Sequence, residues 1–132
     1  MAERRALFQY GNFKLHSGAR SRFKIDCDAL TAEDWATLAE IAVRRVGAFS
    51  TVWSCGGASE RFAVALRAHL DSDGPALIVD DVLTTGETIT DMRNALTPNS
   101  PAVRFLYKGL VVFARGKCPK WVTPLFQYTG ED

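Results

Sequence analysis

The stretch from Ala76 to Thr88 reads ALIVDDVLTTGET, and its order of residues decides the fold. Its first four residues are all apolar, which is typical of a parallel strand that is covered on both faces. Two carboxylates follow at Asp80 and Asp81, and then threonines around one glycine lead toward a helix. Open α/β sheets bind ligands at the carboxyl ends of such strands. The stretch therefore predicts a strand, a loop and a helix with a ligand site between them.

The side chains of this stretch suit a sugar phosphate. Carboxylates accept hydrogen bonds from neighbouring hydroxyl groups. The segment Thr84–Thr88 offers backbone N–H groups and threonine hydroxyls to a phosphate at the positive end of a helix. Successive side chains of a strand point to opposite faces, so we expect the strand to end at the acidic pair, with both carboxylates turned outward. The alternative is a solvated acidic turn followed by a threonine cap.

Strands alternate with helices along the rest of the chain, which predicts an α/β sheet preceded by a β-hairpin. Thr31 and Asp34 have the spacing of a capping box, and apolar residues at helical spacing continue to Gly47. The other predicted elements are a hairpin at 13–27 and strands at 49–53, 76–79, 103–107, 110–114 and 121–127. One further helix should end near Leu70, and another should span 87–96.

Length and composition limit the class of protein. With 132 residues and 47% hydrophobic residues, we expect residues 1–132 to form a single domain. Sixteen basic and fifteen acidic residues nearly cancel, which argues against nucleic acid as a partner. The three cysteines lack paired metal-site spacing, and we expect them to be reduced in a cytoplasmic protein. No apolar run is long enough to span a membrane.

The stretch 76–88 resembles the phosphoribosyl pyrophosphate signature of type I phosphoribosyltransferases, in which an apolar strand, two acidic residues and two apolar residues precede T-T-G-x-T. This resemblance implies a small parallel-sheet, Rossmann-like domain of the phosphoribosyltransferase type. It also implies that Asp80 and Asp81 are the catalytic acidic pair and bind the ribose hydroxyls. The ribose-phosphate site would further contain Val82, Leu83, Thr84, Thr85, Gly86, Glu87 and Thr88.

A second resemblance lies near the N-terminus, where residues 11–21 read GNFKLHSGARS and are similar to the opening hairpin of orotate phosphoribosyltransferases. In that family the hairpin is a hood over the base. His16 stands where those enzymes usually have a lysine. Arg115 ends a segment that resembles their base-proximal strand, and a surface charge at a strand end is the alternative for this arginine. The candidate base-binding residues are His16, Ser17, Phe23, Lys24 and Arg115.

The turn after the strand at 49–53 occupies the place of the family's pyrophosphate loop. Glycine permits a backbone to approach an anion closely, although such turns are often plain connections. The candidate pyrophosphate-binding residues are Ser54, Cys55, Gly56 and Gly57.

The connection between Leu70 and Ala76 is short, whereas the family usually has there another strand and a mobile loop that closes over the substrate. This chain therefore resembles a shortened form of the family. We hypothesise that Arg20, Arg22 and Lys24 of the hairpin replace the basic groups of that loop.

Two functions follow from the resemblance. The first is transfer of a phosphoribosyl group between phosphoribosyl pyrophosphate and an orotate-like or other nitrogenous base, with Mg²⁺ bound mainly through the substrate and the protein as a homodimer. The alternative is a module that binds phosphoribosyl pyrophosphate or a nucleotide and acts as a sensor. A nucleic-acid binder is a third and weaker hypothesis, since it depends on a few hairpin and helix arginines.

Overall fold

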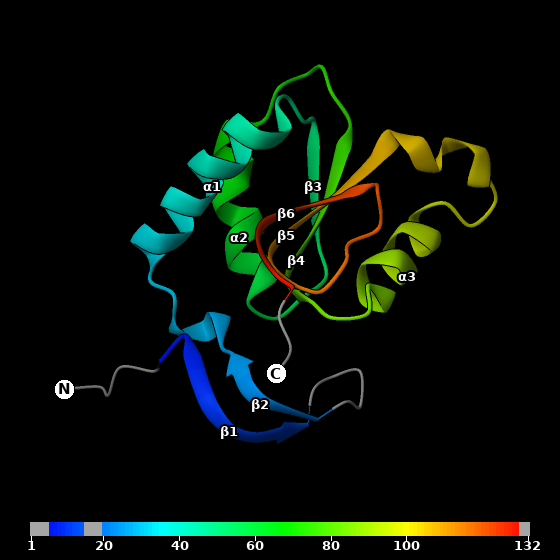
Figure 1. The fold of residues 1–132 in the computed structure, drawn as a ribbon. Helices are drawn as coiled ribbons and strands as arrows, with labels where there is room; N and C mark the ends of the chain where they lie inside the picture. Colours follow the sequence, from blue (N-terminus) through cyan, green and yellow to red (C-terminus); the bar gives the residue numbers. More distant parts are fainter. Residues whose placement is uncertain (1–5, 15–19, 130–132) are drawn as a thin grey trace.

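The computed structural model describes residues 6–14 and 20–129. In this part of the chain a parallel sheet has helices on both faces, and an antiparallel hairpin precedes it (Figure 1). The elements are β1 (Phe8–Lys14), β2 (Arg20–Ile25), η1 (Cys27–Ala29), α1 (Ala32–Val46), β3 (Thr51–Ser54), α2 (Ser59–Leu66), η2 (Arg67–His69), β4 (Ala76–Leu83), α3 (Glu87–Leu96), η3 (Pro101–Leu106), β5 (Tyr107–Arg115) and β6 (Val122–Tyr128). The α/β class predicted from the sequence is confirmed.

The four strands of the main sheet are all parallel and lie in the order β3-β4-β5-β6. Leu77 and Val79 of β4 pack in the hydrophobic cluster that contains α1 and α2, whereas Ile78 packs in the cluster of α3. All three side chains are at most 1% exposed. The apolar run 76–79 is therefore buried on both faces, as its composition predicts.

Helix α1 begins with the capping box that the sequence predicts. The Thr31 hydroxyl accepts the Asp34 N–H at 3.1 Å, and the Asp34 carboxylate accepts the Thr31 N–H at 2.8 Å. Trp35 and Leu38 are buried against the sheet, and the Trp35 ring lies 5.7 Å from that of Phe62 in α2. The helix ends at Gly47, whose φ of 76° suits glycine.

The connection between β5 and β6 contains no helix. Residues 116–121 return along the face of the sheet that α3 covers, so that β6 runs parallel to β5. The Gly109 N–H donates to the Trp121 carbonyl at 2.9 Å, and a Cβ on Gly86 would lie 3.6 Å from Pro119. Parallel strands usually need a crossover of a dozen or more residues. Here an extended segment packed beneath α3 takes the place of a crossover helix.

The predicted strand at 103–107 is wrong. Residues Pro101–Leu106 form the 3-10 helix η3, and β5 begins only at Tyr107. A proline at the start of a helical turn loses no hydrogen bond, which favours the turn. Val103 and Phe105 are exposed, since the position beside β4 belongs to residues 107–115.

The hairpin begins earlier than predicted. Its first strand starts at Phe8 rather than Phe13, and its register shifts between Tyr10 and Phe13 at a bulge. The predicted turn around Ser17 lies outside the described residues. β1 and β2 pair with each other and form a sheet separate from the parallel one.

Gly109 provides a test of the packing around the helix-free crossover. A Cβ at this position would lie 2.6 Å from the Val122 side chain and 3.1 Å from both Ile89 and Trp121. We expect Gly109→Ala to lower the free energy of unfolding by about 1–3 kcal/mol, because the added Cβ would overlap the buried Val122 side chain and crowd that of Ile89. Urea denaturation measures the change.

Gly11→Ala is the matched control, because its Cβ would meet only the mobile ring of Phe13, at 3.3 Å. We expect this variant to stay within about 0.5 kcal/mol of the wild type. Equal losses in the two variants would contradict the packing argument.

Candidate functional site

A cavity of about 240 Å³ lies at the carboxyl end of β4. Its floor is the acidic pair and the loop that leads into α3, and the hairpin and the end of β5 complete its wall. Its lining residues are Phe13, Lys14, Lys24, Ile25, Asp80, Asp81, Val82, Leu83, Thr84, Thr85, Gly86, Glu87, Thr88, Ile89 and Arg115. The structure thus gathers all the predicted ribose-phosphate residues in one pocket, together with Lys24 and Arg115 from the predicted base site.

Both carboxylates of the acidic pair line this pocket, although the strand does not end at them. β4 continues to Leu83, and Asp80 pairs with Val111 of β5. Each carboxylate accepts the N–H of the next residue, Asp80 from Asp81 and Asp81 from Val82, both at 2.9 Å. The expectation that the strand ends at the pair was therefore wrong. Both aspartates line the same pocket although the backbone stays extended, and each carboxylate is held by a hydrogen bond from the next residue.

Burial raises the pKa of Asp80 from its ordinary value of 3.8 to about 8, and a hydrogen bond with Asp81 and the Asp81 charge add to the effect. Two neighbouring carboxyl groups in a partly dry pocket do not readily ionise together. The acidic pair therefore keeps a proton to a higher pH than an isolated aspartate does.

The loop between β4 and α3 lines the pocket, and so do the first residues of the helix. Gly86 has a φ of 85° and is the N-cap residue, so no side chain caps α3 at that position. The Thr85 hydroxyl accepts the Glu87 N–H at 3.3 Å. The first turn of a helix carries unpaired N–H groups and partial positive charge, and both favour a phosphate.

The turn after β3 has the backbone that a close approach to an anion needs. Gly56 and Gly57 have φ of 94° and 60°, and a Cβ at either position would meet no atom within 4 Å. Ser54 donates its hydroxyl to Glu60, and the Gly56 N–H donates to Ser54 at 3.3 Å. These four turn residues do not line the ribose-phosphate pocket.

Cys55 links this turn to the acidic pair. Its pKa is raised to about 12 by burial and by the nearby charges of Asp80 and Asp81. The turn and the acidic pair therefore lie at the same edge of the sheet, since β3 and β4 are parallel neighbours. The thiol stays protonated and is a poor nucleophile at neutral pH.

Arg115 fastens the hairpin to the end of β5. Its guanidinium donates to the Phe23 carbonyl at 3.0 Å and to the Ser21 hydroxyl, and it lies 3.8 Å from the centre of the Phe23 ring. The Phe23 ring lines a different cavity, beside Tyr128. Of the predicted base-binding residues, Lys24 and Arg115 line the pocket, Phe23 does not, and His16 and Ser17 lie outside the described residues.

Lys14 is a pocket residue that the sequence analysis missed. It lines the cavity with Lys24, whereas Arg20 and Arg22 do not. Of the hypothesised group Arg20, Arg22 and Lys24, only Lys24 lines the pocket, and Lys14 joins it there. The alternation of polar and apolar residues along Phe13–Leu15 was the signal available in the sequence for Lys14.

Residues 6–14 and 20–129 contain neither a candidate metal cluster nor a candidate membrane-spanning helix. No group of three or more His, Cys, Asp and Glu side chains in these ranges could hold a metal ion. No helix there is long and apolar enough to cross a membrane.

The raised pKa of Asp80 predicts a pH effect on stability. Between about pH 4 and pH 8 the folded protein holds a proton that the unfolded chain has lost, so this group lowers stability as the pH rises. We expect Asp80→Asn to abolish this fall in stability with rising pH. At pH 9 its free energy of unfolding should exceed that of the wild type by on the order of 2 kcal/mol. The difference should shrink toward pH 5 in thermal unfolding.

Asp91→Asn, an exposed carboxylate on α3, is the control and should follow the wild-type pH profile. Parallel profiles for Asp80→Asn and the wild type would refute the assignment.

The amino-acid sequence matches no known family or curated protein, but several solved structures have a similar fold. No family model and no curated protein sequence matches the chain. The orotate phosphoribosyltransferase of Aeropyrum pernix is 19% identical, with a TM-score of 0.72 over 92% of this chain and 88% of that one. The UMP synthase of Leishmania donovani is 18% identical, with a TM-score of 0.70 over 92% of this chain and 33% of that one.

A third neighbour, the orotate phosphoribosyltransferase of Mycobacterium tuberculosis H37Rv, is 16% identical, with a TM-score of 0.67 over 94% of this chain and 91% of that one. Likeness at such low identity shows the fold and not the activity. The resemblance predicted from the sequence is confirmed at this level: the chain has a type I phosphoribosyltransferase fold that resembles the orotate phosphoribosyltransferases.

Proposed function

We propose that this protein transfers a phosphoribosyl group between phosphoribosyl pyrophosphate and a nitrogenous base. The observation that carries the proposal is the pocket at the end of β4, where two carboxylates and the open start of α3 line the same small cavity. A ligand with two neighbouring hydroxyl groups close to a phosphate fits both features, because the carboxylates can accept from the hydroxyls and the helix start can bind the phosphate. Few other ligands need them side by side.

In the proposed reaction a ring nitrogen of the base, which has released its proton to solvent, attacks C1 of the ribose, and the bond from C1 to the pyrophosphate oxygen breaks. Pyrophosphate leaves with the bonding electrons, and the reverse reaction uses the same groups. Asp80 and Asp81 bind the ribose hydroxyls and offset the positive charge that develops on the ring. The loop Thr84–Thr88 holds the 5-phosphate, so the sugar is fixed at both ends.

The leaving group needs positive charge, and the short connection before β4 supplies no mobile loop. Asp71 donates its N–H to Phe49 at 2.9 Å, Ser50 donates its N–H to Pro75 at 3.0 Å, and Gly74 packs against the backbone of Ala48. This connection is fixed to the neighbouring strand end. We propose that Lys14 and Lys24, which reach the pocket from the hairpin, supply the charge instead.

Magnesium fits this site only as a partner of the substrate. Carboxylate oxygens are suitable ligands, but two aspartates in the described part of the chain do not make a complete cage. Bound Mg²⁺ would neutralise charge on the pyrophosphate. Asp80 and Asp81 are the residues that would hold it, through the ribose hydroxyls or directly.

The base, the assembly and the location stay predictions. His16 and Ser17 are proposed to contact the base, whereas Lys24 is assigned to the leaving group, and Arg115 would act by holding the hairpin in place. A homodimer, a cytoplasmic location and a single domain are the expectations drawn from the sequence.

Exchange of labelled pyrophosphate into phosphoribosyl pyrophosphate tests the proposed reaction. With the correct base or its nucleotide present, we expect Mg²⁺-dependent exchange that falls at least about 100-fold in Asp81→Asn, because one oxygen ligand of the ribose is lost. Pyrimidines, purines and their analogues form the panel. No exchange with any of them would reject the transferase.

The alternative is a sensor that binds the same ligands without turnover, and the fixed connection at 71–75 favours it. Calorimetry separates the two functions. Tight, Mg²⁺-dependent binding of phosphoribosyl pyrophosphate without exchange would indicate the sensor.

The double variant Asp80→Asn, Asp81→Asn should weaken phosphoribosyl pyrophosphate binding by at least about 100-fold for either function, since it removes the charged acceptors of the ribose hydroxyls. Asp91→Asn, on the exposed side of α3, should bind like the wild type. Unchanged affinity in the double variant would place the site elsewhere.

A further inference from the structure

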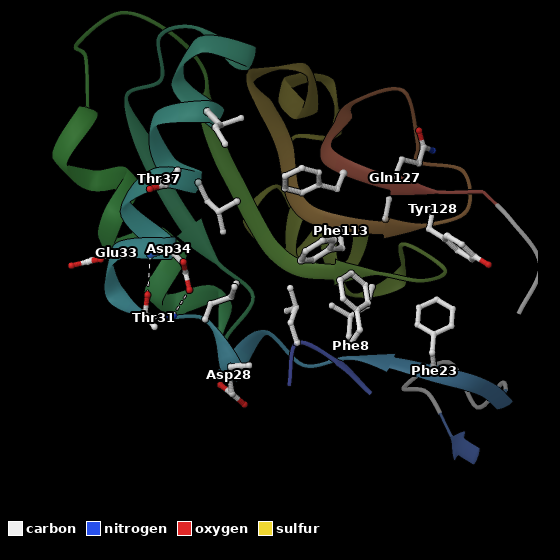
Figure 2. A pocket seen from close by; sticks show the side chains of 18 of the residues that line it. Phe8, Phe23, Asp28, Thr31, Glu33, Asp34, Thr37, Phe113, Gln127 and Tyr128 are labelled. Atoms are coloured by element: carbon white, nitrogen blue, oxygen red, sulfur yellow. Dashed lines mark hydrogen bonds between the residues drawn. The ribbon is translucent and has the colours of Figure 1, made fainter. Parts of the chain in front are cut away.

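A second and much larger cavity lies beside the hairpin. It has a volume of about 1380 Å³ and runs between the hairpin, α1 and the ends of β5 and β6 (Figure 2). We call it the hairpin groove. Ile25 is the one residue that lines both this groove and the ribose-phosphate pocket. The proposed reaction uses none of the other residues in the groove.

Aromatic side chains from three parts of the chain meet in the hairpin groove. The Phe113 ring lies 5.9 Å from Phe8 and 5.4 Å from Phe126, and the Phe23 ring lies 5.2 Å from Tyr128. Tyr10 is 85% exposed, and Phe8, Phe126 and Tyr128 are each at least 40% exposed. An apolar patch of this kind on a folded protein marks an interaction site.

The size of the groove fits a helix better than a small molecule. Sites for small ligands have volumes of about 300–1,000 Å³. A helix about 10 Å wide that rises 1.5 Å per residue fills about 120 Å³ per residue. A groove of about 1380 Å³ therefore accommodates about three helical turns.

The edge of β6 disfavours an extended peptide. A peptide strand that added to the parallel sheet here would pair with the edge of β6. Arg45 of α1 already donates to the carbonyls of Pro124 and Leu125, at 3.2 and 3.4 Å, and Pro124 has no N–H to offer. The edge is therefore blocked where it borders α1, and a helix needs no pairing with it.

Among the residues that the structure describes, the charged ones that line the groove are all acidic. Asp28, Glu33 and Asp34 lie at its end near the start of α1, and none of the described lining residues is a lysine, arginine or histidine. Asp34 is engaged in the capping box, and Asp28 lies 3.9 Å from Arg61, whereas Glu33 is exposed. Charge at the rim of an interface steers and orients the partner. A basic partner complements this rim.

We propose that the hairpin groove binds an amphipathic helix of a partner protein, with its apolar face on the aromatic residues and lysine or arginine residues near the acidic end. The helix covers the exposed rings of Phe8, Tyr10 and Phe126. Its basic side chains lie beside Glu33.

Selection of helical peptides from a displayed library of about 16 randomised residues, with the full chain as bait, tests this proposal. Enriched peptides should have apolar residues at i, i+3 or i+4 and i+7, with lysine or arginine toward one end. Binding of a selected, synthesised peptide should weaken as salt increases.

Two substitutions on α1 locate the peptide. Thr37 lines the groove and is exposed, so Thr37→Arg places a bulky cation in it at no cost to the helix. Ala36 is also exposed but lies outside the groove lining, so Ala36→Arg is the matched control. We expect Thr37→Arg to weaken binding at least about tenfold and Ala36→Arg to leave it within about twofold, with circular dichroism confirming both folds.

Three results would overturn the proposal. The first is that no enriched peptide distinguishes Thr37→Arg from Ala36→Arg. The second is enrichment of acidic or extended peptides. The third is sedimentation showing a dimer that Thr37→Arg dissociates and Ala36→Arg does not, because a second copy of the chain would then occupy the groove.

Discussion

The pairing of β4 with β5 is the constraint on which the rest of the structure depends. Val79 and Asp80 of β4 lie beside Leu110 and Val111 of β5, in a sheet buried on both faces. Because both faces are covered, only the carboxyl end of β4 reaches solvent with polar side chains. The acidic pair, the open start of α3 and the anchoring Arg115 all meet at that end.

The hairpin is the second determinant of function. A two-stranded hairpin is marginally stable by itself, and Arg115 supplies a strong attachment through Phe23 and Ser21. One side of the hairpin brings Lys14 and Lys24 to the ribose-phosphate pocket, and its aromatic residues line the larger groove. The two cavities therefore share the hairpin as a common wall.

The short fixed connection at 71–75 limits how the proposed transferase could stabilise its leaving group. An enzyme without a closing loop has to stabilise its leaving group with groups already in place. The lysines of the hairpin are such groups. The balance between transferase and sensor therefore depends on how well the hairpin positions them.

The sequence by itself determined the buried strand at 76–79, the capped helix after Thr31 and the loop that leads from β4 into α3, because periodicity, capping residues and a contiguous motif are local properties. Tertiary structure decided the rest. Residues 103–106 became a 3-10 turn because β5 took the place beside β4. Lys14 and Lys24, but not Arg20 and Arg22, line the pocket, which depends on how the hairpin packs against the end of the sheet. The raised pKa of Asp80 and the hairpin groove arise from packing between distant segments, which no local pattern records.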